Sequence, residues 1–150
     1  MPLHVQVVTH EGLLFDDSDI DMVVLPGSEG EMGILPHHAA LLTTLNYGEV
    51  RIKKAGAEES FIVYGGVAEV RSNRVIVLAD TAQSTYEVDE AQAVQARTRA
   101  EELMRSGPPE EKVYASDELR RAGIQENILR KVKNRPPTVR IKTIEDDEAK

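Results

Sequence analysis

The sequence contains no cysteine and no tryptophan, and aromatic residues make up only 4% of its 150 residues. Without cysteine the chain forms no disulfide, uses no thiol in catalysis and offers no thiolate to a metal, which fits a reducing compartment. The scarcity of rings leaves no stacking platform for single-stranded nucleic acid, so we expect no nucleic-acid partner. The core must consist of Val, Ile, Leu and Ala.

Long apolar runs are missing as well. No stretch approaches the roughly 18 apolar residues that a membrane span needs. Residues 1–10 show no basic region followed by an apolar run, and they are not rich in Arg and Ser. We therefore expect neither a secretory signal nor a transit peptide, and no direct membrane span.

Charge is unevenly distributed along the chain. The net charge is −8, yet residues 112–142 carry nine basic and three acidic groups, whereas residues 1–86 carry five and twelve. A basic block in an acidic protein indicates a partner surface of negative charge. The alternative is an ordinary solvated helix face.

The first 86 residues have the pattern of a β domain. Short segments rich in Val and Ile are separated by an acidic turn at Asp16–Asp19 and by turn signals at Ala55-Gly56, Gly65-Gly66 and Ser72-Asn73. The expected strands are 3–9, 20–26, 48–54, 60–66, 67–71 and 74–80. This pattern predicts an antiparallel sandwich or barrel, because no helix-length segments separate the strands.

The period changes to that of helices over residues 87–134. Alanines and leucines recur at spacings of three and four in 89–105, with Asp89 as the expected N-cap. A second helix is predicted from about 116 to 134, with Gly123 inside it and Pro136-Pro137 ending it. The chain is thus mainly β plus α, with a two-helix hairpin. Residues 135–150 are expected to be extended and largely disordered, although 138–144 alternate like a strand.

The segment 27–43 is rich in glycine and contains His37-His38, but it matches no catalytic motif. It lacks the Gly-Lys-Ser/Thr ending of a phosphate-binding loop, so we interpret its glycines as turn formers. Adjacent histidines on a strand point to opposite faces and rarely bind one ion. We expect no catalytic residue and no metal site.

Two longer stretches resemble a known family. "GSEGEMGILPHHAALLTTLNYGEVRI" (27–52) and "YGGVAEVRSNRVIVLADTA" (64–82) are similar to the epsilon subunit of bacterial and chloroplast rotary ATP synthases. The second includes the Gly-Gly-x-x-Glu-Val signature at Gly65–Val70. The resemblance covers about residues 3–133 and implies a ten-stranded β-sandwich followed by a helical hairpin.

The resemblance also implies a function. The family is non-catalytic and belongs to the central stalk, where it binds the gamma subunit and the c-subunit ring and helps couple ion flow to ATP synthesis. Its hairpin can contact the alpha/beta catalytic head transiently and inhibit ATP hydrolysis. The implied location is peripheral, at the cytoplasmic face of the bacterial inner membrane.

Candidate interface residues follow from the resemblance by position. The predicted c-ring contacts are Glu29, Glu31, Gly33 and Ile34. The predicted gamma contacts are His38, Leu41, Leu42 and Thr43. The predicted basic contacts of the hairpin with the catalytic head are Arg120, Arg121, Arg130 and Lys131.

A nucleotide site is the remaining candidate. Relatives that bind ATP carry Ile/Leu-Asp-x-x-Arg-Ala at the start of the first helix, whereas Gln92 replaces the arginine here. Asp89, Ala93 and Arg99 match, so the resemblance implies weak ATP binding at most, and we expect no cofactor. The alternative function is a stand-alone nucleotide-sensing β-sandwich module with a helical lid.

Overall fold

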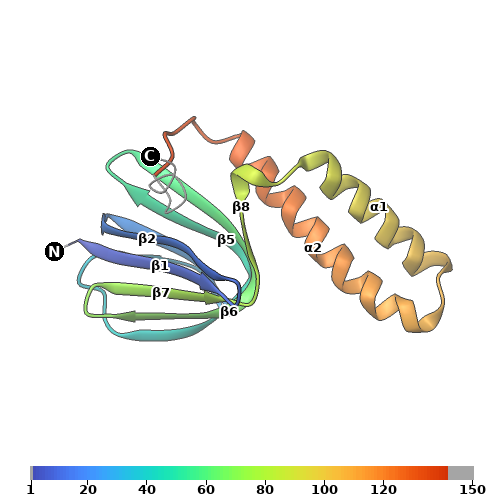
Figure 1. The fold of residues 1–150 in the computed structure, drawn as a ribbon, viewed down its shortest axis with the longest axis horizontal. Coiled ribbons are helices and arrows are strands. Elements are labelled where there is room, and N and C mark those ends of the chain that lie inside the picture. Colours follow the sequence, from blue (N-terminus) through green and yellow to red (C-terminus); the bar gives the residue numbers. More distant parts are fainter. Residues whose placement is uncertain (1, 142–150) are drawn as a thin grey trace. The chain divides into compact units, whose positions relative to one another are not determined.

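The computed structural model describes residues 2–141 and divides into two compact units (Figure 1). The first contains the residues up to Gln83 together with those from Pro136 onward, and the second is Ser84–Arg135. The sequence predicted boundaries at 86 and 134. It treated 135–150 as a separate tail.

The first unit is built from eight strands among the described residues. Their bounds are β1 Leu3–Thr9, β2 Gly12–Ile20, β3 Met22–Gly27, β4 Gly30–Ile34, β5 Leu41–Lys54, β6 Ala57–Arg71, β7 Arg74–Ala79 and β8 Ala82–Ser84. They form one sheet in the order β2-β1-β7-β6-β5-β3-β4, with β8 paired to β6. The count is eight where the family resemblance implied ten.

The long strands β5 and β6 belong to both halves of this sheet. In one half of the sheet, the first part of β5 and the second part of β6 continue into β7, β1 and β2. In the other half, the second part of β5 and the first part of β6 continue into β3 and β4. The sheet therefore folds over on itself as a sandwich. The pairings β1–β2, β3–β4, β3–β5, β5–β6 and β6–β7 are antiparallel, whereas β1 and β7 run parallel.

The core lies between the two halves. Alternate residues of each strand point inward, so the core consists mainly of Val, Ile and Leu, as the composition predicted. Phe15 on β2 and Phe61 on β6 meet edge to face with ring centroids 6.0 Å apart, joining the opposed halves. Lys54 at the end of β5 and Asp17 on β2 form an ion pair of 2.9 Å across the same gap.

The sequence predicted a turn at Gly65-Gly66. In the structure these two glycines instead bend β6 in its middle. Their φ angles are +85° and +131°, which side chains of L-residues rarely adopt. The two other predicted turns are confirmed as tight hairpin turns with positive φ, at Ala55-Gly56 and Ser72-Asn73.

The expected acidic turn is part of a strand. Asp16–Asp19 lie in β2, which pairs with β1 from Gly12 to Ile20. The carboxylates of Asp16 and Asp17 are both paired with side chains of other strands, so the pleated conformation is stabilised despite their low strand propensity.

The second unit contains a short 3-10 turn, Thr85–Glu87, and two helices, α1 Glu90–Ser106 and α2 Pro109–Lys133. Asp89 caps α1 as predicted, accepting a 2.9 Å hydrogen bond from the Ala91 amide. The predicted start of α2 near 116 is wrong. The helix begins at Pro109, since proline fits the first helical position and acidic residues follow in the first turn.

Small residues are buried in the hairpin. Ala93 and Ala100 on α1 and Ala115 and Ala122 on α2 are at most 2% exposed. Cross-helix ion pairs join Arg97 to Glu126 and Glu90 to Lys133. The predicted Ala-rich face of α1 therefore exists, and α2 supplies alanines of its own.

Candidate functional site

The β3–β4 hairpin carries the residues predicted to contact the c-ring. Glu29, Glu31 and Gly33 are exposed, and Gly30, at φ +134°, closes the tight connection between the strands. Ile34 is different because it is fully buried in the core cluster. Its side chain supports the hairpin from inside and offers no surface to a partner in this conformation.

The loop after β4 contains the two adjacent histidines. His37 has φ +67°, and its amide donates a 2.7 Å hydrogen bond to Asn73 Oδ1 in the β6–β7 turn. His38 Nδ1 lies 2.8 Å from the Ala39 carbonyl oxygen, and the side chain is exposed. The loop is thus fixed to the β6–β7 turn, with His38 on the surface.

The start of β5 holds the other predicted gamma contacts. Leu42 is 72% exposed, whereas Leu41 packs against the core and Thr43 is half-buried. The alternation of the strand explains the difference, since neighbouring side chains point to opposite faces. Of the three, Leu42 is therefore the one available to a partner.

An apolar row that sequence reasoning missed crosses four strands of the sandwich; on β5 it meets Thr44, while Leu42 lies opposite Glu69. Register pairs Val67 on β6 with Leu78 on β7, Leu78 with Val8 on β1, and Val8 with Leu13 on β2. Leu78 and Leu13 are 48% and 43% exposed, and the two valines are half-buried. Such a row on the outside of a sheet is a candidate interaction surface. The residues lie far apart in the sequence, so only the strand register reveals it.

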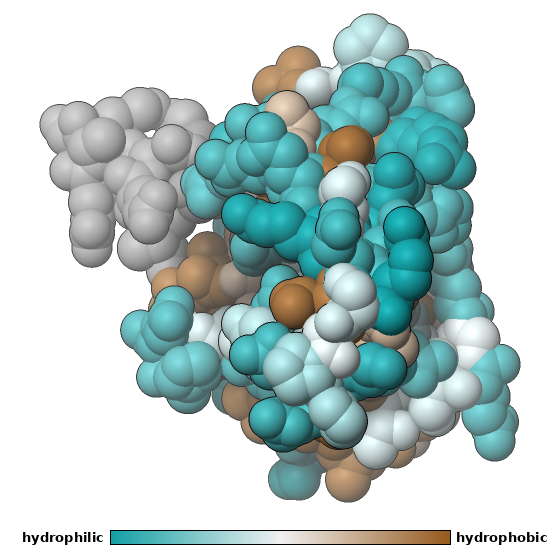
Figure 2. Space-filling model, turned by 90° about the vertical axis from the view of Figure 1, so that its right-hand side faces the viewer, coloured by the Kyte–Doolittle hydropathy of each residue, from teal (hydrophilic) through white to brown (hydrophobic). Residues whose placement is uncertain are grey.

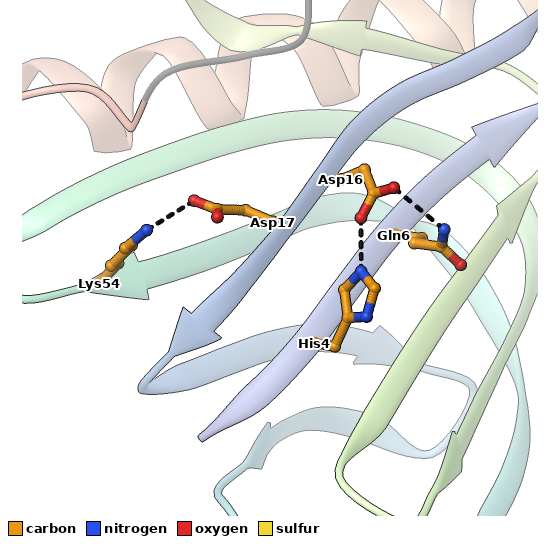
Figure 3. A network of polar contacts seen from close by, with 5 residues as sticks. All are labelled: His4, Gln6, Asp16, Asp17 and Lys54. Atoms are coloured by element: carbon orange, nitrogen blue, oxygen red, sulfur yellow. Dashed lines mark hydrogen bonds and ion pairs between the residues drawn. The ribbon is translucent and has the colours of Figure 1, made fainter. Parts of the chain in front are cut away.

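Polar residues occupy the neighbouring part of the same sheet (Figure 3). His4 Nε2 lies 2.5 Å from Asp16 Oδ1, and Gln6 Nε2 donates to Asp16 Oδ2 at 3.3 Å. The hydrogen bond from His4 lowers the pKa of Asp16 below its usual value of 3.8; Gln6 and the charge of Arg74 act in the same direction and partial burial opposes them. This network pins β1 to β2 and shows no catalytic geometry.

The predicted basic residues of the hairpin lie along α2. Arg120, Arg130 and Lys131 are exposed, and Arg121 pairs with Asp117 one turn earlier at 3.1 Å. Arg120 and Lys131 are eleven residues apart, which places them on one side of the helix about 16 Å from each other. Hydrophilic residues also cover most of the face seen in Figure 2, where hydrophobic ones are scattered.

The structure does not gather the candidate ATP residues into a pocket. The Asp89 carboxylate is engaged as the helix cap, and Ala93 is buried. Arg99 is exposed and lies about 15 Å further along α1 than Asp89. Gln92, which replaces the arginine of ATP-binding relatives, is exposed too.

Within residues 2–141 no three His, Asp or Glu side chains come together in a way that could hold a metal ion. In the same part of the chain, neither helix is both long and apolar enough to cross a membrane.

Known proteins match this chain closely. The family described as ATP synthase, Delta/Epsilon chain, beta-sandwich domain matches residues 2–85. The ATP synthase epsilon chain of Dehalococcoides mccartyi is 43% identical over 136 residues, which is 89% of this chain and 96% of that one. The epsilon chain of Herpetosiphon aurantiacus is 40% identical over 136 residues, covering 90% and 99%.

Solved structures agree on the fold. A chain of the Euglena gracilis mitochondrial ATP synthase, solved as an OSCP/F1/c-ring assembly, superimposes with a TM-score of 0.75 at 19% identity, covering 85% of this chain and 81% of that one. A central-stalk and c-ring structure from Tetrahymena thermophila gives 0.60 at 14%, covering 86% and 97%. The matching domain and the curated relatives together show that this chain belongs to the ATP synthase epsilon chain family.

Proposed function

We propose that this chain is a non-catalytic rotor subunit of ATP synthase that binds the gamma subunit and the c-ring and helps couple ion flow to ATP synthesis. The observation that carries the proposal is the apolar row on the outside of the sandwich, with the exposed Leu42 diagonally across from Val67 on the neighbouring strand β5. A surface of this kind is stabilised by a permanent apolar partner. The similar solved structures are assemblies that include a c-ring and, in one case, the central stalk, which supports this choice of partners.

The tip of the β3–β4 hairpin suits the c-ring. Glu29 and Glu31 project from a short, well-paired hairpin and are exposed. Exposed carboxylates on a rigid tip recognise polar or basic loops and set the register of docking more than its strength. In this proposal the chain is peripheral at the cytoplasmic face of the bacterial inner membrane.

The hairpin supplies the inhibitory part of the proposal. In this proposal α2 separates from α1, and its basic residues meet an acidic surface of the alpha/beta head. Opposite charges would steer the encounter and make inhibition sensitive to salt.

Substitution of Leu42 by Asp tests the gamma surface. We expect the variant to fold but to be lost from the purified complex, because a carboxylate would be buried at the interface. The matched control is Val113→Asp on α2, where the side chain is 80% exposed. Retention of L42D in the complex at wild-type stoichiometry would remove the proposed gamma surface.

The c-ring and hairpin proposals need separate tests. Glu31→Lys should reduce ATP-driven ion pumping by the assembled enzyme while leaving the circular dichroism of the isolated chain unchanged. Reversal of the α2 charges in full-length chain (R120E, R130E and K131E together) should raise the rate of ATP hydrolysis and abolish its salt dependence. Unchanged hydrolysis in the triple variant would reject the inhibitory role.

A further inference from the structure

The segment after the hairpin returns to the sandwich. The Val139 carbonyl oxygen accepts a 2.8 Å hydrogen bond from the Glu58 amide, and Val139 pairs in parallel with Ala57 on β6. The next residue, Arg140, donates from Nε and Nη2 to the two carboxylate oxygens of Glu59, at 3.0 and 3.1 Å. Ile141 is 4% exposed and belongs to the core cluster. Residues 139–141 of the predicted extended tail are therefore docked on the sandwich. The remainder of the tail, 142–150, lies outside the described residues.

The contact partner of Arg140 is an unusual residue. Glu59 shares the core-facing side of β6 with Phe61 and Val63, and its side chain is fully buried. A buried carboxylate is costly unless it is paired and hydrogen-bonded. The two-pronged bond from Arg140, whose side chain is 40% exposed, supplies both conditions, so the tail provides the partner of a buried carboxylate of the sandwich.

The docked segment also covers an edge of the sheet. The Tyr64 amide donates to Thr81 next to β8, and the Glu58 amide donates to Val139, so β8 and the tail lie along the same edge of β6. A strand edge with free amides is a template for strand addition. Here the chain fills part of that edge with its own residues.

While Val139 is docked on the sandwich, the length of the connecting chain limits how far α2 can move. α2 ends at Lys133, six residues before Val139, and six extended residues span at most about 20 Å. Pro136 and Pro137 stiffen this connection. A helix of 25 residues is about 37 Å long, so α2 cannot move away by its own length while Val139 stays bound.

We propose that Val139, Arg140 and Ile141 form a clasp that holds the end of the hairpin at the sandwich and must open before α2 can extend. The clasp consists of three contacts: an aliphatic residue pairs with the β6 edge, an arginine binds the buried Glu59 with two hydrogen bonds, and an aliphatic side chain enters the core. Its effect on ATP hydrolysis rests on the proposed inhibitory role of the hairpin, whereas its existence in the isolated chain does not.

Amide hydrogen exchange on the isolated full-length chain tests the clasp directly. In Arg140→Met the Glu58 amide should exchange at least tenfold faster, while the Tyr64 amide on the same edge keeps its wild-type rate. The charge-matched control is Arg105→Met at the exposed end of α1. If loss of the Arg140 partner of Glu59 prevents folding of Arg140→Met, the double variant Glu59→Gln, Arg140→Met removes the buried charge and gives the same comparison. Equal Glu58 exchange in wild type and variant would overturn the clasp.

A reversible lock tests its role in extension. The natural chain has no cysteine, so Ala57→Cys with Val139→Cys places the only two thiols at the paired positions. Oxidised, this chain should leave the assembled ATP synthase at least several-fold less inhibited in ATP hydrolysis than the reduced form. Each single-cysteine variant should show no redox effect.

The two tests separate the failure of the clasp from the failure of the inhibitory role. If the charge-reversed α2 variant relieves inhibition but the oxidised lock does not, the clasp does not restrain extension. If neither changes hydrolysis, the inhibitory role is rejected, and the exchange of the Glu58 amide alone decides whether the clasp exists.

Discussion

Gly66 on β6 lies opposite Ala79 on β7, and its replacement by alanine should destabilise the sandwich strongly. A Cβ atom at this position would lie 2.2 Å from the Leu78 carbonyl oxygen and 2.8 Å from Ala79 Cα. Both are backbone atoms of the paired strand, so no side-chain rotation relieves the overlap. The φ of +131° adds strain of its own for any residue with a Cβ.

The two effects can be added approximately. Backbone strain at such a φ costs about 1–3 kcal/mol, and forcing an extra methyl into a closed contact costs about 1–3 kcal/mol. The expected loss of roughly 2–6 kcal/mol is a large part of the 5–15 kcal/mol that stabilises an ordinary domain. Gly123→Ala is the matched control, because nothing lies within 4 Å of its Cβ and alanine favours the interior of α2 by about 1 kcal/mol.

Guanidinium unfolding measures the difference. Near-ultraviolet circular dichroism of Tyr47 and Tyr64, whose rings meet edge to face 5.6 Å apart, reports on the sandwich close to Gly66. The midpoint should fall sharply in Gly66→Ala, and the sandwich transition should be unchanged in Gly123→Ala. A free energy of unfolding for Gly66→Ala within about 0.5 kcal/mol of wild type, the usual spread for neutral surface changes, would refute the reasoning from close approach and φ.

Three further predictions concern charge and packing. The pKa of the Asp16 carboxyl is lowered in the folded chain. The stability that its ionised form contributes is therefore fully present above the unfolded-state pKa and is lost as the pH falls through the folded-state pKa. Asp16→Asn should flatten the loss of stability below about pH 4 in denaturant titrations. Arg97→Met should destabilise the hairpin by about 1–3 kcal/mol in helical circular dichroism, since Glu126, 11% exposed, loses its charged partner. Ala115→Leu should cost about 1–3 kcal/mol by the same measurement, because Ala115 is fully buried and has no room for a larger side chain.

Three strands could be predicted from the sequence with nearly correct bounds. β1 and β7 alternate, β3 is a short apolar run, and their expected bounds differ from the observed ones by two residues at most, whereas β4, β8 and the first half of β5 were not predicted. β2 was missed because its acidic residues are matched by His4, Gln6 and Lys54, which lie up to 37 residues away. Local patterns carry no information on such partners, so an acidic strand looks like a turn.

The candidate surfaces show the same limit. The family resemblance located exposed residues such as Glu31 and Leu42, but it also included Ile34, which faces the core. The apolar row could not be predicted from the sequence because it runs across strands instead of along one; it consists of Leu13, Val8, Leu78 and Val67. Surface continuity depends on register, which single-strand patterns do not specify.

Glu59 shows why the strand-like tail and the sandwich have to be interpreted together. Alternation alone predicts an apolar residue between Ala57 and Phe61 on the core-facing side of β6, yet this position is a glutamate. It becomes consistent with the fold once Arg140 is included, because the half-exposed guanidinium supplies the opposite charge and the two hydrogen bonds that a buried carboxylate requires. Such a pair adds little to a permanently closed fold, but it makes docking of the tail specific for an arginine flanked by aliphatic residues. The buried charge is therefore better understood as a device for recognising the tail than as a device for stabilising the sandwich.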